Sequence, residues 1–219
     1  MSAPFAVGTG FLLSADSAIC LTAASLDIWR GERCLFTGLS FELGPGQVAI
    51  VTGPNGTGKT TLLRVLAGLA MPTSGTAMWR GTPIHRLPPE RRTSVAYQGH
   101  MDGLKKELTV LENLTFYRAL WAGKEEIAPL MAELGLSGLE QRQVRHLSAG
   151  QRRRVALGCM RLRPATLWIL DEPLTNLDTG GAELVSQWLE THTTAGGMAV
   201  VATHQPERLT RRVSLEIEL

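Results

Sequence analysis

Short apolar segments are separated along this chain by polar, glycine-rich and helix-periodic stretches. The pattern predicts strands at 21–28, 35–43, 48–52, 94–97, 166–170, 198–203 and 213–219. Two stretches within them, 167–170 and 198–202, are continuously apolar, which is typical of strands buried on both faces of a parallel sheet. Helical periodicity dominates from about 109 to 160. The pattern therefore predicts an α/β fold in which a helical insert lies between strands.

Two helix starts inside the insert carry the capping pattern of a Ser or Thr followed three residues later by Glu or Gln. Thr109 with Glu112 predicts one helix, and Ser148 with Gln151 predicts another. Earlier in the chain, the two consecutive prolines at 88–89 predict a loop.

A phosphate-binding loop is predicted directly after the strand at 48–52. The run that fits G-x-x-x-x-G-K-[ST] and precedes an apolar helical segment at 62–69 is Gly53-Pro54-Asn55-Gly56-Thr57-Gly58-Lys59-Thr60-Thr61. Its glycines let backbone N–H groups point at an anion, and the helix N-terminus adds partial positive charge. Lys59 supplies a mobile charge for the β- and γ-phosphates, and the Thr60 hydroxyl is suited to ligate Mg²⁺.

Two carboxylates follow the strand at 166–170. Asp171 and Glu172 stand at the carboxyl end of this strand, which is the edge where parallel α/β sheets bind ligands. We expect Asp171 to hold Mg²⁺ and Glu172 to polarise an attacking water as general base. A strand that ends in a solvated acidic turn is the alternative, and the phosphate loop in the same chain favours the catalytic interpretation.

The run Leu147-Ser148-Ala149-Gly150-Gln151 resembles the signature L-S-G-G-Q of the ATP-binding-cassette ATPases, with Ala149 in place of one glycine. In that family the signature closes over the γ-phosphate of ATP bound by a second subunit. The resemblance thus implies that Ser148, Gly150 and Gln151 act on the nucleotide of a second copy. It also implies the cassette fold over 21–219: a RecA-like P-loop core, an antiparallel β subdomain and a helical signature subdomain at about 99–163. We expect residues 1–20 to be a flexible extension.

The remaining family elements occur in the family's order. The resemblance implies that Gln98 touches Mg²⁺ and water, that Asp178 lies near the dimer contact, and that His204 hydrogen-bonds the γ-phosphate. The family usually stacks adenine on an aromatic residue about 23 positions before the phosphate loop. That position is occupied here by Arg30, with Trp29 beside it, so either the guanidinium or the neighbouring indole is the stacking group.

Composition narrows the classes of partner. The chain has 219 residues and a net charge of +2, which gives no strong attraction to nucleic acid. We expect the run 152–154, three arginines, to form a solvated and interface face of the signature helix, because no aromatic platform accompanies it. The three cysteines are far apart, which argues against a disulfide framework or a zinc site. No apolar run approaches the roughly 20 residues of a membrane span, so we expect a motor subunit that recruits membrane partners.

Local segments resemble one branch of the family, the haem-exporter ATP-binding subunits of bacterial cytochrome c maturation. They are 30–36, 97–100, 103–114, 165–173 and 203–206. This resemblance implies a peripheral subunit on the cytoplasmic side of the inner membrane, working with the membrane proteins CcmB, CcmC and CcmD. It would serve haem delivery to the periplasmic haem chaperone CcmE. The alternatives are a cassette for another small substrate and a soluble cassette ATPase without a transport role. His85, His100, His146 and His192 show no pairing that suggests haem ligation.

Overall fold

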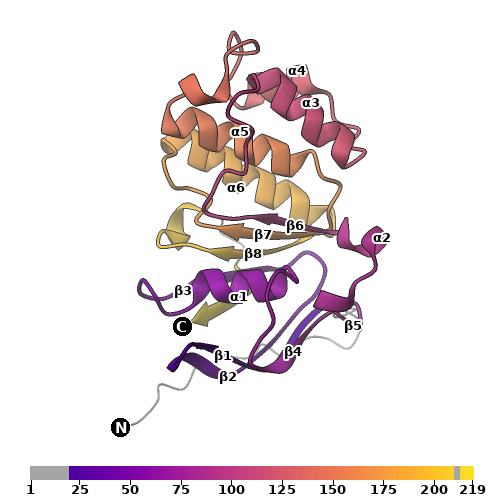
Figure 1. Cartoon of the computed structure of the whole chain (residues 1–219), viewed down its shortest axis with the longest axis vertical. Coiled ribbons are helices and arrows are strands. Elements are labelled where there is room, and N and C mark those ends of the chain that lie inside the picture. Colours follow the sequence, from indigo (N-terminus) through magenta and orange to yellow (C-terminus); the bar gives the residue numbers. More distant parts are fainter. Residues whose placement is uncertain (1–19, 210–212) are drawn as a thin grey trace.

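The computed structural model describes residues 20–209 and 213–219, which form two sheets and six α-helices (Figure 1). The parallel sheet, in the order β6-β7-β8-β3-β9, consists of β6 (Val95–Gln98), β7 (Leu167–Asp171), β8 (Met198–Ala202), β3 (Val48–Thr52) and β9 (Leu215–Glu218). The antiparallel sheet, in the order β2-β1-β4-β5, consists of β2 (Arg33–Leu43), β1 (Leu21–Arg30), β4 (Ser74–Trp79) and β5 (Thr82–Pro83). The helices are α1 (Lys59–Leu66), α2 (Pro89–Arg92), α3 (Val110–Leu120), α4 (Ile127–Glu133), α5 (Ala149–Arg161) and α6 (Thr179–Thr194). Short 3₁₀ turns occur at Ile84–Arg86, Val144–His146 and Pro206–Arg208.

The parallel sheet is covered on both faces, as its continuously apolar strands predicted. Along β3, Val48 and Ile50 pack into one hydrophobic core, whereas Ala49 and Val51 pack into the other. The first core joins the sheet to α3–α6, and the second joins it to α1 and the antiparallel sheet. Figure 1 shows α5 and α6 on one side of β6–β8 and α1 on the other. The strand alternation thus sandwiches the sheet between two layers.

The predicted α/β class with a parallel sheet is confirmed, and all seven predicted strands are present as β1, β2, β3, β6, β7, β8 and β9. The sequence analysis missed α6 and β4. The start of α6 contains Gly180 and Gly181, which weaken a helical pattern. The loop predicted at 88–89 is wrong in part, because Pro89 opens the single turn α2. Proline suits that first helical position, where no intrahelical partner exists for an N–H.

Cys20 is the one residue of the predicted extension that the structure describes, and residues 1–19 lie outside the described residues. Cys20 is buried, and its N–H donates to the Leu43 carbonyl at 3.1 Å. Its own carbonyl accepts from the Arg80 N–H at 2.6 Å. Cys20 therefore continues the inner strand β1 of the antiparallel sheet.

Three helices, α3, α4 and α5, are inserted in the sequence between the adjacent strands β6 and β7. The capping box predicted at the start of α3 is confirmed: the Thr109 N–H donates to Glu112 Oε2 at 2.7 Å, and the Glu112 N–H donates to Thr109 Oγ1 at 3.1 Å. Asn113 is fully buried and binds the backbone of Lys105 through both its amide oxygen and its amide nitrogen.

Over 20–209 and 213–219, no helix combines the length and apolar character that crossing a membrane requires.

Candidate nucleotide-binding site

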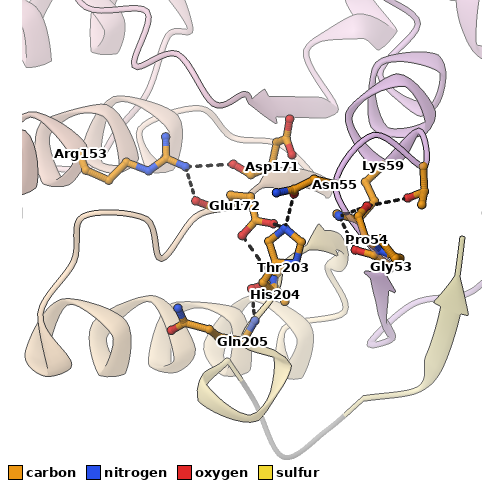
Figure 2. Close-up of polar contacts among 11 residues, drawn as sticks. Gly53, Pro54, Asn55, Lys59, Arg153, Asp171, Glu172, Thr203, His204 and Gln205 are labelled. Carbon is orange, nitrogen blue, oxygen red and sulfur yellow. Dashed lines mark hydrogen bonds and ion pairs between the residues drawn. The ribbon is translucent and has the colours of Figure 1, made fainter. Parts of the chain in front are cut away.

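Four neighbouring strand ends bring the predicted site residues together. Gln98 ends β6, Asp171 ends β7, His204 follows β8 and the phosphate loop at 53–58 follows β3. These strands are adjacent in the sheet order β6-β7-β8-β3 and all parallel, so their carboxyl ends form one edge. Figure 2 shows His204 between Asn55 and Glu172, with Lys59 beside Gly53 and Pro54 on the phosphate loop. The sheet topology therefore builds the site from segments that are distant in sequence.

The phosphate loop closes through a left-handed glycine. Gly58 has φ 115° at the N-terminus of α1, and a Cβ there would lie 3.2 Å from both Leu35 Cβ and Phe36 Cε1. No side chain caps α1, so its first N–H groups remain open towards a ligand. Lys59 is buried, and its Nζ donates to the carbonyl of Gly53 at 2.6 Å and of Pro54 at 3.1 Å. The ammonium charge is thus held inside the loop that it would share with a phosphate.

Asp171 carries an orphaned polar atom. The residue is 2% exposed, and its Oδ2 is buried without a hydrogen-bond partner. Gln98 is also buried, and its Nε2 donates to the carbonyls of Gly99 at 3.2 Å and Met101 at 3.3 Å, which leaves Oε1 as its ligand atom. With the Thr60 hydroxyl, these oxygens form the hard donor set that Mg²⁺ prefers alongside phosphate oxygens. The residues present therefore fit a magnesium ion.

Glu172 and His204 are joined at the centre of the site. Glu172 has φ 48°, which is costly for a residue with a side chain, and its N–H donates to the Ala202 carbonyl at 2.9 Å. His204 Nε2 lies 2.9 Å from Asn55 Oδ1 and 3.3 Å from Glu172 Oε1, although the latter is not a well-directed hydrogen bond. Because both neighbours are acceptors, Nε2 is the ring nitrogen placed to donate. The imidazole therefore bridges the phosphate loop and the carboxylate (Figure 2).

A cavity of about 560 Å³ adjoins this edge, and Thr60 and Gln98 line it together with residues of α3 and α5. Tyr97 is also on its wall. Burial, with a smaller contribution from the Asp171 charge, raises the pKa of the Tyr97 phenol. The cavity therefore connects the predicted metal ligands with the helical segment.

The signature residues form a helix cap of their own. The Ser148 N–H donates to Gln151 Oε1 at 3.0 Å, and the Gln151 N–H donates to Ser148 Oγ at 3.2 Å, so the predicted capping box is confirmed. Gly150 is packed so closely that a Cβ would lie 2.8 Å from the Asn176 carbonyl oxygen. In the described part of the chain, the hydrogen bonds of Ser148 and Gln151 do not reach 53–61. Ser148 and Ala149 are exposed, and the structure leaves the signature apart from its own phosphate loop.

Asp178 is the N-cap of α6. Its Oδ1 accepts from the Gly181 N–H at 2.9 Å and from Arg154 Nη2 at 2.5 Å. The Gly181 hydrogen bond, followed by Arg154, lowers the pKa of this carboxyl. Arg154 also donates to the Leu134 carbonyl at 2.8 Å, so it links α6 with the loop after α4. Asp178 is therefore a fixed anion beside the signature helix.

The two adenine candidates both lie at the exposed end of the β1–β2 hairpin. Arg30 pairs with Arg33 across the turn. Trp29 is 47% exposed, and its backbone N–H donates to Thr73 Oγ1 at 3.1 Å. Both alternatives stay open. Leu35 and Phe36, which the sequence analysis did not select, are the hairpin residues packed against Gly58.

Comparison with known proteins decides the family. The model of the ABC transporter family matches residues 36–175. The chain belongs to this family. The cytochrome c biogenesis ATP-binding export protein CcmA of Escherichia coli (strain K12) is 45% identical over 199 residues, which cover 89% of this chain and 96% of the relative. CcmA of Shigella flexneri shows the same identity and coverage.

Solved structures agree with the cassette fold. An ATP-binding subunit of an ABC transporter superposes with a TM-score of 0.81 at 24% identity, covering 91% of this chain and 85% of the other. A nucleotide-free ATP-binding cassette superposes with a TM-score of 0.73 at 22% identity, covering 92% and 87%. The family and the cassette fold predicted from the sequence motifs are therefore confirmed.

One prediction for this cassette is wrong. The arginine run was expected to form a solvated and interface face, but Arg153 is 2% exposed. It lies three residues before Ala156 and seven before Met160, on the buried face of α5. That spacing was the available signal in the sequence, and the run of three like charges masked it. Arg152 is directed to the backbone instead, with Nη1 donating to the Leu147 carbonyl at 2.6 Å.

Proposed function

We propose that this chain is the ATP-hydrolysing subunit of an inner-membrane ABC complex that supports haem export or delivery in cytochrome c biogenesis. The family match and the CcmA relatives at 45% identity support this function. The observation that carries the ATPase part is the convergence of the phosphate loop, the 171–172 carboxylates and His204 at one sheet edge.

The phosphate loop binds the triphosphate in this proposal. Backbone N–H groups of the loop and of the uncapped start of α1 donate to phosphate oxygens. Lys59 exchanges its hydrogen bonds with the Gly53 and Pro54 carbonyls for contacts with the β- and γ-phosphates. The residues assigned to phosphate binding are Gly53, Pro54, Asn55, Gly56, Thr57, Gly58, Lys59, Thr60 and Thr61. Arg30 or Trp29 stacks on the adenine.

Thr60, Gln98 and Asp171 would hold Mg²⁺ beside the phosphates. The orphaned Oδ2 of Asp171 supports this assignment, because a buried carboxylate oxygen without a donor needs another source of positive charge. An ion held by these residues would neutralise charge on the phosphoryl oxygens. The amide nitrogen of Gln98 donates to carbonyls of its own loop, so its amide oxygen would be the atom that contacts the ion and water.

Glu172 acts as the general base that takes a proton from the attacking water. The Ala202 carbonyl holds its backbone N–H at the strand end, and its Oε1 accepts no well-directed hydrogen bond. His204 Nε2–H, which now faces Asn55 and Glu172, donates to the γ-phosphate once nucleotide is bound. With a proton on Nε2, the ring is a hydrogen-bond donor to that phosphate.

A second copy of the chain completes each site. Ser148, Gly150 and Gln151 of one copy close over the γ-phosphate held by the other, with Asp178 near the contact. The exposure of Ser148 and Asp178 in the single chain, and the separation of Ser148 and Gln151 from its own phosphate loop, support this arrangement. Closure between two copies would expel water and strengthen the contacts to phosphate.

The membrane partners in this proposal are CcmB with CcmC and CcmD, and the chain lies peripherally on the cytoplasmic side of the inner membrane. The helical subdomain at about 99–163 passes closure to them through the 560 Å³ cavity beside Gln98. The complex serves the haem chaperone CcmE, and no nucleic acid takes part.

The test is a haem-stained denaturing gel of cells whose only copy of this chain carries Lys59→Ala. We expect covalent c-type haem to be lost and to be restored by the unaltered chain. The exposed Lys124→Ala is the matched control and should leave the staining unchanged. Normal c-type haem with Lys59→Ala would reject the haem role and leave the family assignment in place.

A further inference from the structure

Arg153 is a buried cation that holds two separate segments of the site. Its Nη1 donates to the Gly99 carbonyl at 3.1 Å, in the loop after β6. Its Nη2 donates to the carbonyls of Asp171 at 3.0 Å and Glu172 at 2.9 Å, and its Nε donates to the Pro173 carbonyl at 3.3 Å. Figure 2 shows the side chain reaching from α5 to the backbone of Asp171 and Glu172.

These contacts depend on the shape of the guanidinium. Its donors lie in one rigid plane, so the carbonyls on its two sides cannot move independently while all four bonds persist. Burial lowers the pKa of Arg153, whereas Asp102, with its Oδ1 3.6 Å from Nη1, raises it. The charge is thus stabilised by backbone carbonyls and one carboxylate at the wall of the cavity.

The Glu172 backbone needs such support. A residue with a side chain at φ 48° is strained and persists only where its surroundings fix it. The Glu172 N–H is fixed by the Ala202 carbonyl at 2.9 Å, and the Glu172 carbonyl is fixed by Arg153 at 2.9 Å. Gly99 shares its carbonyl between Arg153 and the side chain of Gln98.

We infer that Arg153 is a positioning residue that sets the Glu172 carboxylate for water attack and ties its position to the Gly99 loop. The inference rests on the proposed role of Glu172 as general base. A displacement of the 99–102 loop at the cavity is transmitted through one guanidinium to the backbone of the base. The hydrogen bonds of Arg153 go to Gly99 and to the backbone at 171–173 and none goes to the phosphate loop, so we expect Arg153 to act on turnover and to leave ATP binding little changed.

The first test is ATP hydrolysis by the full chain with Arg153→Lys, which keeps the charge and loses the planar fork. We expect kcat to fall about tenfold or more while KM changes less than about twofold. Arg161→Lys is the matched control, because Arg161 lies on the same helix and pairs with Glu125 at 3.0 Å and Glu133 at 3.3 Å, away from the strand ends. It should leave kcat unchanged. Equal effects of both substitutions, or a rise in KM alone, would overturn the inference.

A second measurement separates positioning from general loosening of the fold. In a chain that already carries Glu172→Gln, Arg153→Lys should lower the residual rate no further, because the group it positions is gone. A further tenfold loss in that background would overturn the inference. If Glu172→Gln by itself keeps normal turnover, the proposed base is wrong, which is a different result from failure of Arg153.

If Arg153→Lys does not fold, as judged by circular dichroism, Asp102→Asn decides the question. That change keeps Arg153 and removes the charge of its partner. We expect a two- to threefold lower kcat with unchanged KM, an order-of-magnitude guide for a weakened ion pair. Unchanged kcat in a folded Asp102→Asn chain would overturn the inference.

Discussion

The N-termini of α1 and α5 carry the two phosphate-related motifs, and they differ in whether side chains cap them. α1 follows a left-handed Gly58, and no side chain accepts from its first turn. α5 is closed by Ser148 and Gln151, which exchange two hydrogen bonds. The first N-terminus presents open N–H groups with a lysine held inside the loop, and the second has satisfied part of its own donors.

This difference assigns different tasks to the two ends. Open N–H groups and the Lys59 ammonium can cradle a phosphate chain. The Ser148 Oγ already accepts from the Gln151 N–H, but its own hydroxyl proton remains for a single bond to an oxyanion. One chain therefore has a phosphate cradle and, elsewhere, a capped donor that can complete the cradle of another copy.

Glu172→Gln removes the proposed general base beside the phosphate loop and has the largest expected effect. We expect hydrolysis to fall by about 10²–10³-fold with ATP affinity preserved, because the amide cannot take a proton while Lys59 still binds phosphate. Phosphate release and equilibrium dialysis measure the two quantities. Glu183→Gln, on the exposed face of α6, is the control and should change neither. Near-normal turnover of the Glu172→Gln chain would contradict its assigned role.

Lys59→Ala removes the lysine that the phosphate loop is proposed to use for ATP binding. We expect ATP affinity to fall by about 10- to 100-fold, because the loop loses the charge that its carbonyls now hold. Equilibrium dialysis with labelled ATP measures the loss, and Lys124→Ala should bind as the unaltered chain does. Unchanged affinity of the Lys59→Ala chain would remove the phosphate-loop interpretation.

Ser148→Ala sharpens the comparison from the other side, because the chain offers a matched cap in Thr109→Ala. Both changes remove one half of a capping box, and each should cost about 1 kcal/mol of stability in urea unfolding. Hydrolysis should fall about tenfold only for Ser148→Ala, since only that hydroxyl is proposed to meet a phosphate. If both variants lose activity equally, the signature serine is a helix cap and nothing more.

The smallest expected effect concerns the opposite edge of the sheet. His192 is stacked on Trp168 with ring centroids 3.9 Å apart, and its Nε2 lies 3.2 Å from the carbonyls of Thr166 and Met198. Burial lowers the pKa of His192 from its usual 6.5, although the two carbonyls oppose the shift. The unfolded chain therefore takes up the proton first as pH falls below about 6.5, and stability falls with it.

The unaltered chain should therefore lose stability between pH 7.5 and pH 5.5. Urea unfolding of the chain and of His192→Gln at these pH values measures it, and the variant should show the smaller loss. ATP affinity of the folded chain should not change with His192→Gln, because the ring lies at the amino ends of β7 and β8. An identical pH dependence in both chains would exclude His192 as the titrating group.

The strands and the residues at their carboxyl ends could be predicted because short stretches of neighbouring residues identify them. Continuous apolar runs identify β7 and β8, and the short motifs at 53–61 and 171–172 follow their strands directly. Helical spacing carried a signal for the burial of Arg153, but not for its partners, which are backbone carbonyls 54 and 18 to 20 residues away. The link between His204 and Asn55, 149 residues apart, depends in the same way on the sheet order. Adenine stacking stays undecided because Arg30 and Trp29 share one exposed hairpin end.

The most direct test of the claim that two copies complete each other's sites is the mass of the Glu172→Gln chain in solution. Light scattering measures this mass with and without ATP and Mg²⁺. We predict that nucleotide doubles the mass, because the slow variant keeps two copies closed around ATP. Adding Ser148→Arg should abolish the doubling, and adding Thr109→Ala should leave it intact. A mass that does not respond to ATP, or a doubling that survives Ser148→Arg, would contradict the claim that the capped end of one copy completes the open end of another.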